Sequence, residues 1–200
     1  MKKSLVLAGL LAISSSAYAM DVNYFIAVGG GKGYETVNVN VAGVTESVSD
    51  NGGVFSIDTG VLLNDTHRIG LEYSKYNTTG SSSLYSIGLG YNYRIHIKDS
   101  KFKPFVGMSY AILKYSEDMV NDASVTWDQS TYNITTKALL GSIGVDYDIN
   151  KNLYASMRYD YALSTSGSTD IGLTVGGTHY TGNAEFDKFS QLQLLIGYKF

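Results

Sequence analysis

The sequence has 200 residues, 22 glycines, 17 tyrosines, one proline, no cysteine and a net charge of −3. The lack of cysteine excludes a disulfide framework, and the slight negative charge argues against a nucleic-acid partner, which would need a basic surface. This composition favours strands and turns over helices and suits a single domain.

The first residues have the features of a secretory signal peptide. Two lysines follow the initial methionine, residues 5–13 are apolar, and an Ala-Tyr-Ala cleavage site stands at 17–19. The apolar stretch is too short for a membrane-spanning helix, which needs about 20 apolar residues. We therefore expect a cleaved signal peptide over 1–19 and an exported domain over 20–200.

From residue 22 onward, apolar side chains alternate with small or polar ones. A period of two is typical of a β-strand whose two faces meet different surroundings. The predicted strands, in chain order, are 22–28, 55–63, 68–76, 85–95, 105–112, 138–149, 153–163 and 190–200. Strands of about ten residues, when tilted, are long enough to cross the hydrocarbon layer of a bilayer.

The connections between these strands alternate in length. Tight turns are expected after the second, fourth and sixth strands, and loops are expected at 32–53, 77–81, 116–131 and 164–188. Short turns at one end, longer loops at the other and an even strand count are typical of outer-membrane barrels, whose turns face the periplasm. The sequence therefore predicts an all-β fold, an eight-stranded antiparallel up-and-down transmembrane β-barrel.

One face of the predicted strands carries charges among glycine, serine and alanine, and the other face is almost free of charge. An arginine or lysine that faces lipid at the bilayer midplane costs about 2–4 kcal/mol, so the charged face should be the inner one. The predicted polar network of the lumen is Asp58, Glu72, Arg94, Asp146, Arg158, Asp160 and Gln193. Since eight strands leave an interior about filled by side chains, we expect these residues to fill the barrel as paired charges.

Aromatic residues of the outer face gather near both ends of the predicted strands. Those near the periplasmic end are Tyr24, Tyr93, Tyr147, Tyr198 and Phe200, and those near the outer end are Tyr73, Tyr85, Tyr110, Tyr159 and Tyr161. Amphipathic rings favour the two membrane–water interfaces. This clustering is not explained by the general preference of tyrosine for strands.

The last strand, Ser190 to Phe200, alternates apolar and polar residues and ends on an aromatic ring. With this ending and eight strands, the chain from Met20 to Phe200 resembles the small outer-membrane barrels of Gram-negative bacteria, namely the OmpA transmembrane domain, OmpX and opacity-type surface proteins. The resemblance implies a place in the bacterial outer membrane, with lipid and lipopolysaccharide as neighbours. It also implies that Tyr198 and Phe200 form the signal read by the barrel-assembly machinery.

Few residues point to chemistry. The run Gly29-Gly30-Gly31-Lys32-Gly33 lacks the spacing of a phosphate loop, and we expect its glycines to let a strand end bend into a loop. His67, His96 and His179 do not converge, and the segments 50–52 and 121–122 fit no complete calcium loop. We therefore expect no metal and no cofactor.

The expected role is structural or a surface interaction through the loops at 32–53, 116–131 and 164–188, without enzymatic activity. Two alternatives stay open. One is a lipid A-modifying enzyme, for which His179 with Ser164, Ser166, Ser168 or Asp170 is the candidate set. The other is a small gated pore through the polar lumen. The sequence does not identify a ligand for the loops.

Overall fold

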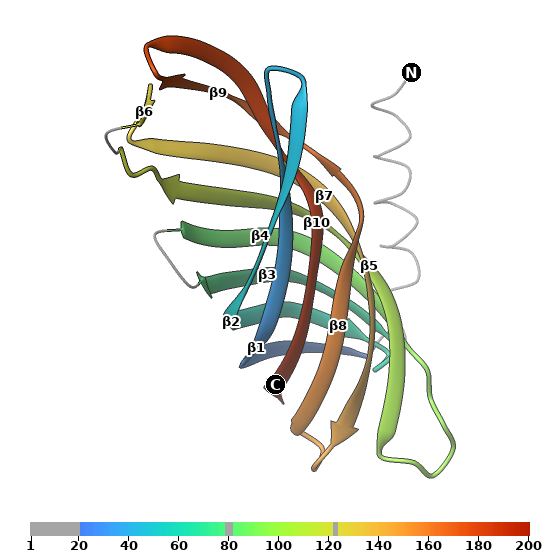
Figure 1. The fold of residues 1–200 in the computed structure, drawn as a ribbon. Coiled ribbons are helices and arrows are strands. Elements are labelled where there is room, and N and C mark those ends of the chain that lie inside the picture. The colour runs from blue at the N-terminus through green and yellow to red at the C-terminus, as the bar shows by residue number, and fades with distance from the viewer. Residues whose placement is uncertain (1–20, 79–81, 122–123) are drawn as a thin grey trace, which may run out of the picture.

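The computed structural model describes residues 21–78, 82–121 and 124–200, and most of them lie in antiparallel strands that curve into a barrel (Figure 1). The strands are β1 (Val22–Val41), β2 (Val44–Leu63), β3 (His67–Thr78), β4 (Ser82–Arg94), β5 (Phe102–Asp118), β6 (Val125–Trp127), β7 (Thr131–Asp148), β8 (Leu153–Ser166), β9 (Ser168–Val175) and β10 (Thr178–Lys199). The described residues contain no helix long and apolar enough to span a membrane.

Eight of these strands close a ring. They are hydrogen-bonded in the order β1-β2-β3-β4-β5-β7-β8-β10, and β1 also pairs with β10, which closes the barrel. The predicted eight-stranded up-and-down barrel is thus confirmed. The expected signal peptide at 1–19 lies outside the described residues.

Two further strands lie outside the ring. Strand β9 pairs with the first part of β10, where Thr178 faces Val175, and β6 pairs with β9. They therefore widen the sheet at the end of the barrel opposite the chain ends. We call this the loop end, and the end with the tight turns at 64–66, 95–101 and 149–152 the turn end.

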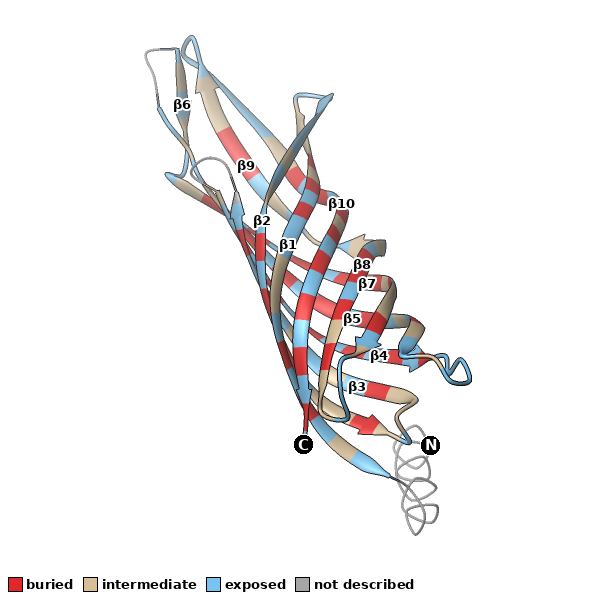
Figure 2. Cartoon of the chain, turned by 90° about the horizontal axis from the view of Figure 1, so that it is seen from below, coloured by how far each residue is buried: buried red, intermediate tan, exposed pale blue. Residues whose placement is uncertain are grey.

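Burial alternates along the strands, as the banded colouring of Figure 2 shows. In β4 every second residue from Leu84 to Arg94 is buried, and the residues between them are exposed. The exposed set consists of Tyr85, Ile87, Leu89, Tyr91 and Tyr93, whereas Ser86, Asn92 and Arg94 are buried. Apolar side chains therefore cover the outside of the barrel, and polar ones lie inside.

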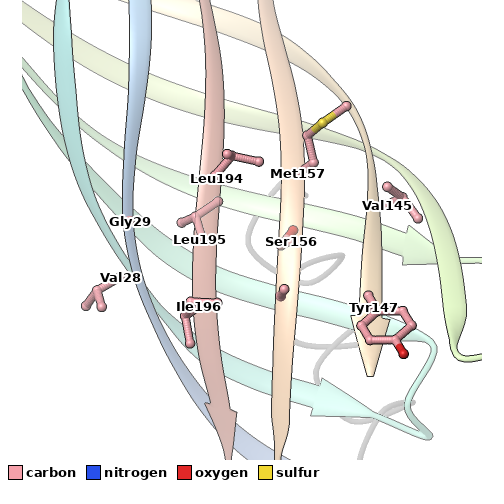
Figure 3. Close-up of a pocket in the computed structure, with 10 residues that line it drawn as sticks. Val28, Gly29, Val145, Tyr147, Ser156, Met157, Leu194, Leu195 and Ile196 are labelled. Carbon is pink, nitrogen blue, oxygen red and sulfur yellow. The ribbon is translucent and has the colours of Figure 1, made fainter. Parts of the chain in front are cut away.

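Part of the outer face is hollowed between β1, β10, β8 and β7 (Figure 3). The hollow has a volume of about 380 Å³, and its lining includes Val28, Ile196, Met157 and Tyr147. The small side chain of Ala155 lies among these larger ones. The result is an apolar groove on the surface that faces away from the barrel axis.

The loop predicted at 32–53 is wrong, because this segment is a long hairpin. Strands β1 and β2 stay paired as far as Val41 and Val44, and only Ala42 (φ 52°) and Gly43 (φ 81°) form the turn. Two-residue turns with positive φ at both positions match the twist of paired strands. The asparagines and serines of this segment are typical of a loop. The segment is nevertheless extended, because the backbone groups of β1 and β2 hydrogen-bond to each other along its whole length.

The other two long loops are also partly strand. Strands β9 and β10 occupy most of 164–188, and β6 lies within 116–131. The glycine run at 29–33 likewise lies inside β1 and not at a strand end, so the expected bend there is wrong. A Cβ on Gly31 would lie 1.8 Å from the carbonyl oxygen of Leu192, which shows how closely β1 and β10 approach.

Candidate functional site: the filled lumen and its outer mouth

A cluster of charges surrounds Arg158 in the middle of the barrel. The guanidinium lies 2.7 Å from an oxygen of Asp58, 3.2 Å from Glu72 and 3.0 Å from Asp160. It also donates a hydrogen bond of 2.6 Å to Oε1 of Gln193. Three carboxylates therefore contact one buried cation, and the positive charge of Arg68 also acts on Asp58 and Glu72 without a direct ion pair.

Amides and hydroxyls connect this cluster to the strands around it. Nε2 of Gln191 donates to Asp160 at 2.7 Å, and the hydroxyl of Tyr76 donates to Oε1 of Gln191 at 2.5 Å. Ser142 donates to the other oxygen of Asp160 at 2.6 Å. These bonds satisfy buried carboxylate and amide groups that would otherwise be costly to remove from water.

A second cluster lies at the turn end. Nε of Arg94 lies 2.7 Å from Asp146 and its Nη1 lies 2.5 Å from Asp65, while Arg68 also pairs with Asp146. Lys103 and Lys199 lie 2.6 Å and 3.0 Å from Asp148. Cations outnumber carboxylates here, so the two clusters have opposite charge balances along the axis.

Asp65 is the turn residue of this second cluster. Partial burial by itself raises the pKa of Asp65, but the hydrogen bond from Lys103 and the charges of Arg94, Lys199 and Lys103 lower that pKa to about 2. The carboxyl group is therefore ionised at neutral pH and ties the turn between β2 and β3 to β4, β5 and β10.

Arg68 is enclosed by aromatic rings as well as by carboxylate. Its guanidinium carbon lies 5.4 Å from the ring centre of Phe25, 5.5 Å from Phe105 and 5.2 Å from Tyr154. Cation–π attraction is strongest when the cation is desolvated, as it is here. Arg68 therefore has both a carboxylate and aromatic rings as partners in the lumen.

The seven residues predicted for the lumen are divided between the two clusters. Arg94 and Asp146 lie at the turn end, and Arg158 lies in the middle with the other four around it. All are buried except Glu72, whose side chain is 13% exposed. The prediction omitted Arg68, Lys103, Lys199, Asp65 and Asp148. The parity of Arg68 with Glu72, of Asp148 with Asp146 and of Lys199 with Gln193 would have identified three of them. Asp65 lies in a turn and has no parity.

The half of the lumen nearer the loop end is apolar, a feature that was not predicted from the sequence. Its buried cluster comprises Val37, Val54, Tyr76, Leu84, Ala111, Leu113, Tyr115, Tyr132, Ile134, Ala138, Leu140, Ile171, Ala184, Phe186 and Phe189. The ring of Phe189 lies 5.5 Å from Tyr76 and 6.3 Å from Phe186. Because this cluster includes residues of β1, β9 and β10, it continues from the barrel into the strands beyond it.

Above this cluster a cavity of about 260 Å³ opens at the mouth of the barrel. Its walls come from the β1–β2 hairpin, from the end of β5 and from the segment that follows β5. Among the lining residues are Glu35 on β1 and Trp127 on β6. Glu35 is only 6% exposed although it is acidic, and this makes the cavity the second candidate site.

The set proposed for catalysis does not come together. Nε2 of His179 lies 2.9 Å from Asp128, while Ser168 and Asp170 face Glu185 and Asn183 on β10. At about 3.3 Å per strand residue, these positions are at least about 13 Å from His179 along β10. His67 and His96 contact Tyr91 and the backbone of Asp65 instead. Among the residues that the structure describes, no group of three or more His, Asp or Glu could hold a metal ion.

A closed ring of strands, an apolar outer face and buried charges together define an integral β-barrel membrane protein, because only a closed sheet satisfies its backbone in lipid. The family model described as outer membrane protein beta-barrel domain matches residues 5–200. The chain belongs to this family, and its place is the bacterial outer membrane.

Solved structures agree with the fold. Neisserial surface protein A superposes with a TM-score of 0.50 at 18% identity, covering 88% of this chain and 97% of that one. The outer membrane protein OprG from Pseudomonas aeruginosa gives a TM-score of 0.50 at 16% identity, with coverages of 89% and 96%. A comparison with curated proteins gave no match. Identities this low show the fold alone.

Proposed function

We propose that this barrel is a surface-interaction protein whose strands beyond the membrane form the binding surface. In outer-membrane barrels the short turns face the periplasm, so the loop end lies outside the cell. The β1–β2 hairpin and the β9–β10 pair both extend to this end (Figure 1). A partner therefore meets paired strands instead of loops.

The observation that carries this proposal is the continuous apolar cluster. Val37 of the hairpin, Ile171 of β9 and Phe186 of β10 belong to the same cluster as Leu113 inside the barrel. The hydroxyl of Tyr132 donates to the carbonyl oxygen of Gly172 at 2.8 Å and accepts from its N–H at 3.0 Å, which joins β7 to β9. These contacts hold the extension in one arrangement, and a preordered surface binds at a lower entropic cost.

The filled lumen argues against the pore alternative. Arg94, Asp146 and Asp160 are fully buried, and so are the apolar Leu84, Leu113 and Phe189 nearer the loop end. An ion would have to displace paired charges and then cross an apolar layer. We therefore propose no steady conductance, which planar-bilayer recordings of the purified protein would contradict by showing discrete channel events.

The enzyme alternative has little geometric support, because His179 pairs with Asp128 far from the serines proposed as its partners. Unchanged lipid A mass spectra in cells that express the protein would agree with this view. A modified lipid A that reverts to normal in His179→Ala would overturn it.

Three exposed lysines support a proposed contact with lipid at the outer membrane interface. Lys32, Lys75 and Lys114 are exposed on the outer face, and Nζ of Lys114 lies 5.9 Å from the ring centre of Tyr85 in the outer aromatic belt. Lysines at this level are suited to the phosphate groups of lipopolysaccharide. We propose that replacing all three with glutamine lowers the lipopolysaccharide that copurifies with the barrel.

The surface role is tested by shortening the hairpin without disturbing its base. Residues 38–47 are replaced with Asn-Gly, which retains the pair Val37 and Val48. Cells with either form are compared for attachment to epithelial cells and to immobilised matrix protein, and boiled and unboiled samples are compared on gels. We expect the variant to keep its heat-sensitive compact form and lose attachment. Undiminished attachment by a folded variant would contradict a role for the hairpin.

A further inference from the structure

The cavity at the outer mouth has apolar walls. Val37, Val39 and Val48 of the hairpin line one side, and Met119 and Trp127 line the other. Val48 is 55% exposed although it is apolar. The ring of Trp127 is held in an edge contact with Tyr132 at 6.0 Å, so this wall has a defined orientation.

Carboxylates surround the same space. Glu35 and Asp50 are directly opposite each other on β1 and β2, and Glu46 and Glu117 also line the cavity. Like charges in directly opposite cross-strand positions are destabilising unless something compensates for them. The described residues that line the cavity include no lysine, arginine or histidine.

Glu35 is the buried member of this group. Among the described residues, its Oε1 atom has no hydrogen-bond partner, whereas Glu117 accepts a hydrogen bond of 2.6 Å from the hydroxyl of Tyr115. Burial, with the charges of Asp50 and Glu117, raises the pKa of Glu35 to about 7. Its neighbour on β10 is the uncharged Phe189. A buried acceptor without a donor lacks the partner that such groups normally have.

We propose that the mouth cavity binds a small organic cation with an apolar body, of the arylalkylammonium class. The cationic group lies at the Glu35 and Asp50 carboxylates, and the apolar body lies against Trp127, Met119 and the hairpin valines. Tryptophan also attracts cations through its ring face. The volume of about 260 Å³ suits a ligand below drug size.

An organic cation fits these walls better than a metal ion. Within the described part of the chain, no group of three or more acidic or histidine side chains is arranged for a metal. A hard divalent cation takes six or more oxygen ligands, whereas most of the lining of this cavity is apolar. The cavity shares one wall with the hairpin, but cation binding is measured by Trp127 fluorescence of the purified barrel and attachment is measured on cells, so the two proposals can fail independently.

The test uses the single tryptophan of the chain as its probe. Benzyltrimethylammonium is titrated into the folded barrel in a non-ionic detergent while Trp127 fluorescence is recorded, with benzyl alcohol, 3-phenylpropionate and calcium chloride in parallel. We expect saturable binding of the cation. The neutral and anionic analogues should bind at least about tenfold more weakly. Equal affinity for benzyl alcohol, or a stronger response to calcium, would overturn the proposal.

Glu35→Gln should weaken benzyltrimethylammonium binding about tenfold, since it removes the buried charge and keeps the shape. The wild type should bind more tightly as the pH rises from 6 to 8, because the cation favours the ionised form of Glu35, and the variant should lose this dependence. Glu185→Gln, which changes an exposed carboxylate on β10 outside the cavity, is the matched control. Folding of Glu35→Gln is checked by comparing boiled and unboiled samples on gels. If this variant does not fold, Glu117→Gln replaces it. Wild-type affinity in the folded variant would refute the site.

Discussion

Arg158 on β8 and Asp58 on β2 form an ion pair of 2.7 Å, although 100 positions separate them in the chain. The two strands are not neighbours in the ring, since β10 and β1 lie between them. The pair therefore crosses the lumen and ties opposite parts of the wall together. Glu72 on β3 and Asp160 on β8 share the same guanidinium.

Replacing Arg158 with methionine should destabilise the barrel by about 3–5 kcal/mol, because three carboxylates then lose their buried counter-charge. Urea unfolding of the refolded protein in micelles, followed by circular dichroism, measures this loss. The exposed Lys75→Met serves as the control. We expect Asp58→Asn to recover part of the loss in the Arg158→Met background. If Arg158→Met and the control Lys75→Met lowered stability equally, the central role of this pair would be contradicted.

Asp65 should make stability depend on acid pH in a defined window. Its pKa is about 2 in the folded protein against an ordinary value of 3.8, so its ionised form favours folding above pH 4. That contribution is lost as the pH falls through the folded pKa. Asp65→Asn should therefore be less stable than wild type at pH 7, and the difference should shrink between about pH 4 and pH 2. Unfolding midpoints of both proteins across this range provide the measurement, and a constant difference would refute the coupling to Lys103 and Arg94.

The seam between β1 and β10 should not tolerate a methyl group at Gly31. The added Cβ would lie 1.8 Å from the backbone oxygen of Leu192, so the strands would have to separate, at a cost of about 1–3 kcal/mol. Gly53 on β2 has no atom within 4 Å of the same position, and Gly53→Ala should leave stability unchanged or raise it slightly. The two variants are compared by the temperature at which each loses its compact form on gels. Equal melting of the two variants would show that the seam adapts without cost.

A substitution of Phe200 should separate the effect on assembly in cells from the effect on the stability of the folded barrel. Its side chain is exposed, while its N–H donates to the carbonyl oxygen of Tyr24 at 2.9 Å and its ring meets Tyr198 at 5.0 Å. Phe200→Ser keeps the backbone bond and should refold in detergent with near wild-type stability. In cells we expect a lower amount in the outer membrane, measured by blotting of membrane fractions, because we propose that the assembly machinery reads this ring. Normal levels in cells would remove Phe200 from that signal.

The alternation of side chains was predictable from the sequence, because a strand turns successive residues to opposite faces wherever it lies. Ile87 and Arg94 could be assigned to opposite faces without coordinates, and they lie on those faces. The cost of charge in lipid then indicated which face is inner. Closure of the ring was predicted from the even strand count together with short turns at one end and longer loops at the other, which are typical of outer-membrane barrels.

Only the tertiary structure decided which residues meet across the lumen. Arg158 could pair with any carboxylate of the inner face, and the choice of Asp58, Glu72 and Asp160 depends on the stagger of the strands. The hairpin beyond Lys32 and the apolar cluster around Phe189 were missed for a related reason. A polar segment becomes a strand when a neighbour completes its hydrogen bonds, and an inward residue becomes core when others close over it. Both conditions depend on residues that are distant in the sequence, so the local sequence pattern does not predict them.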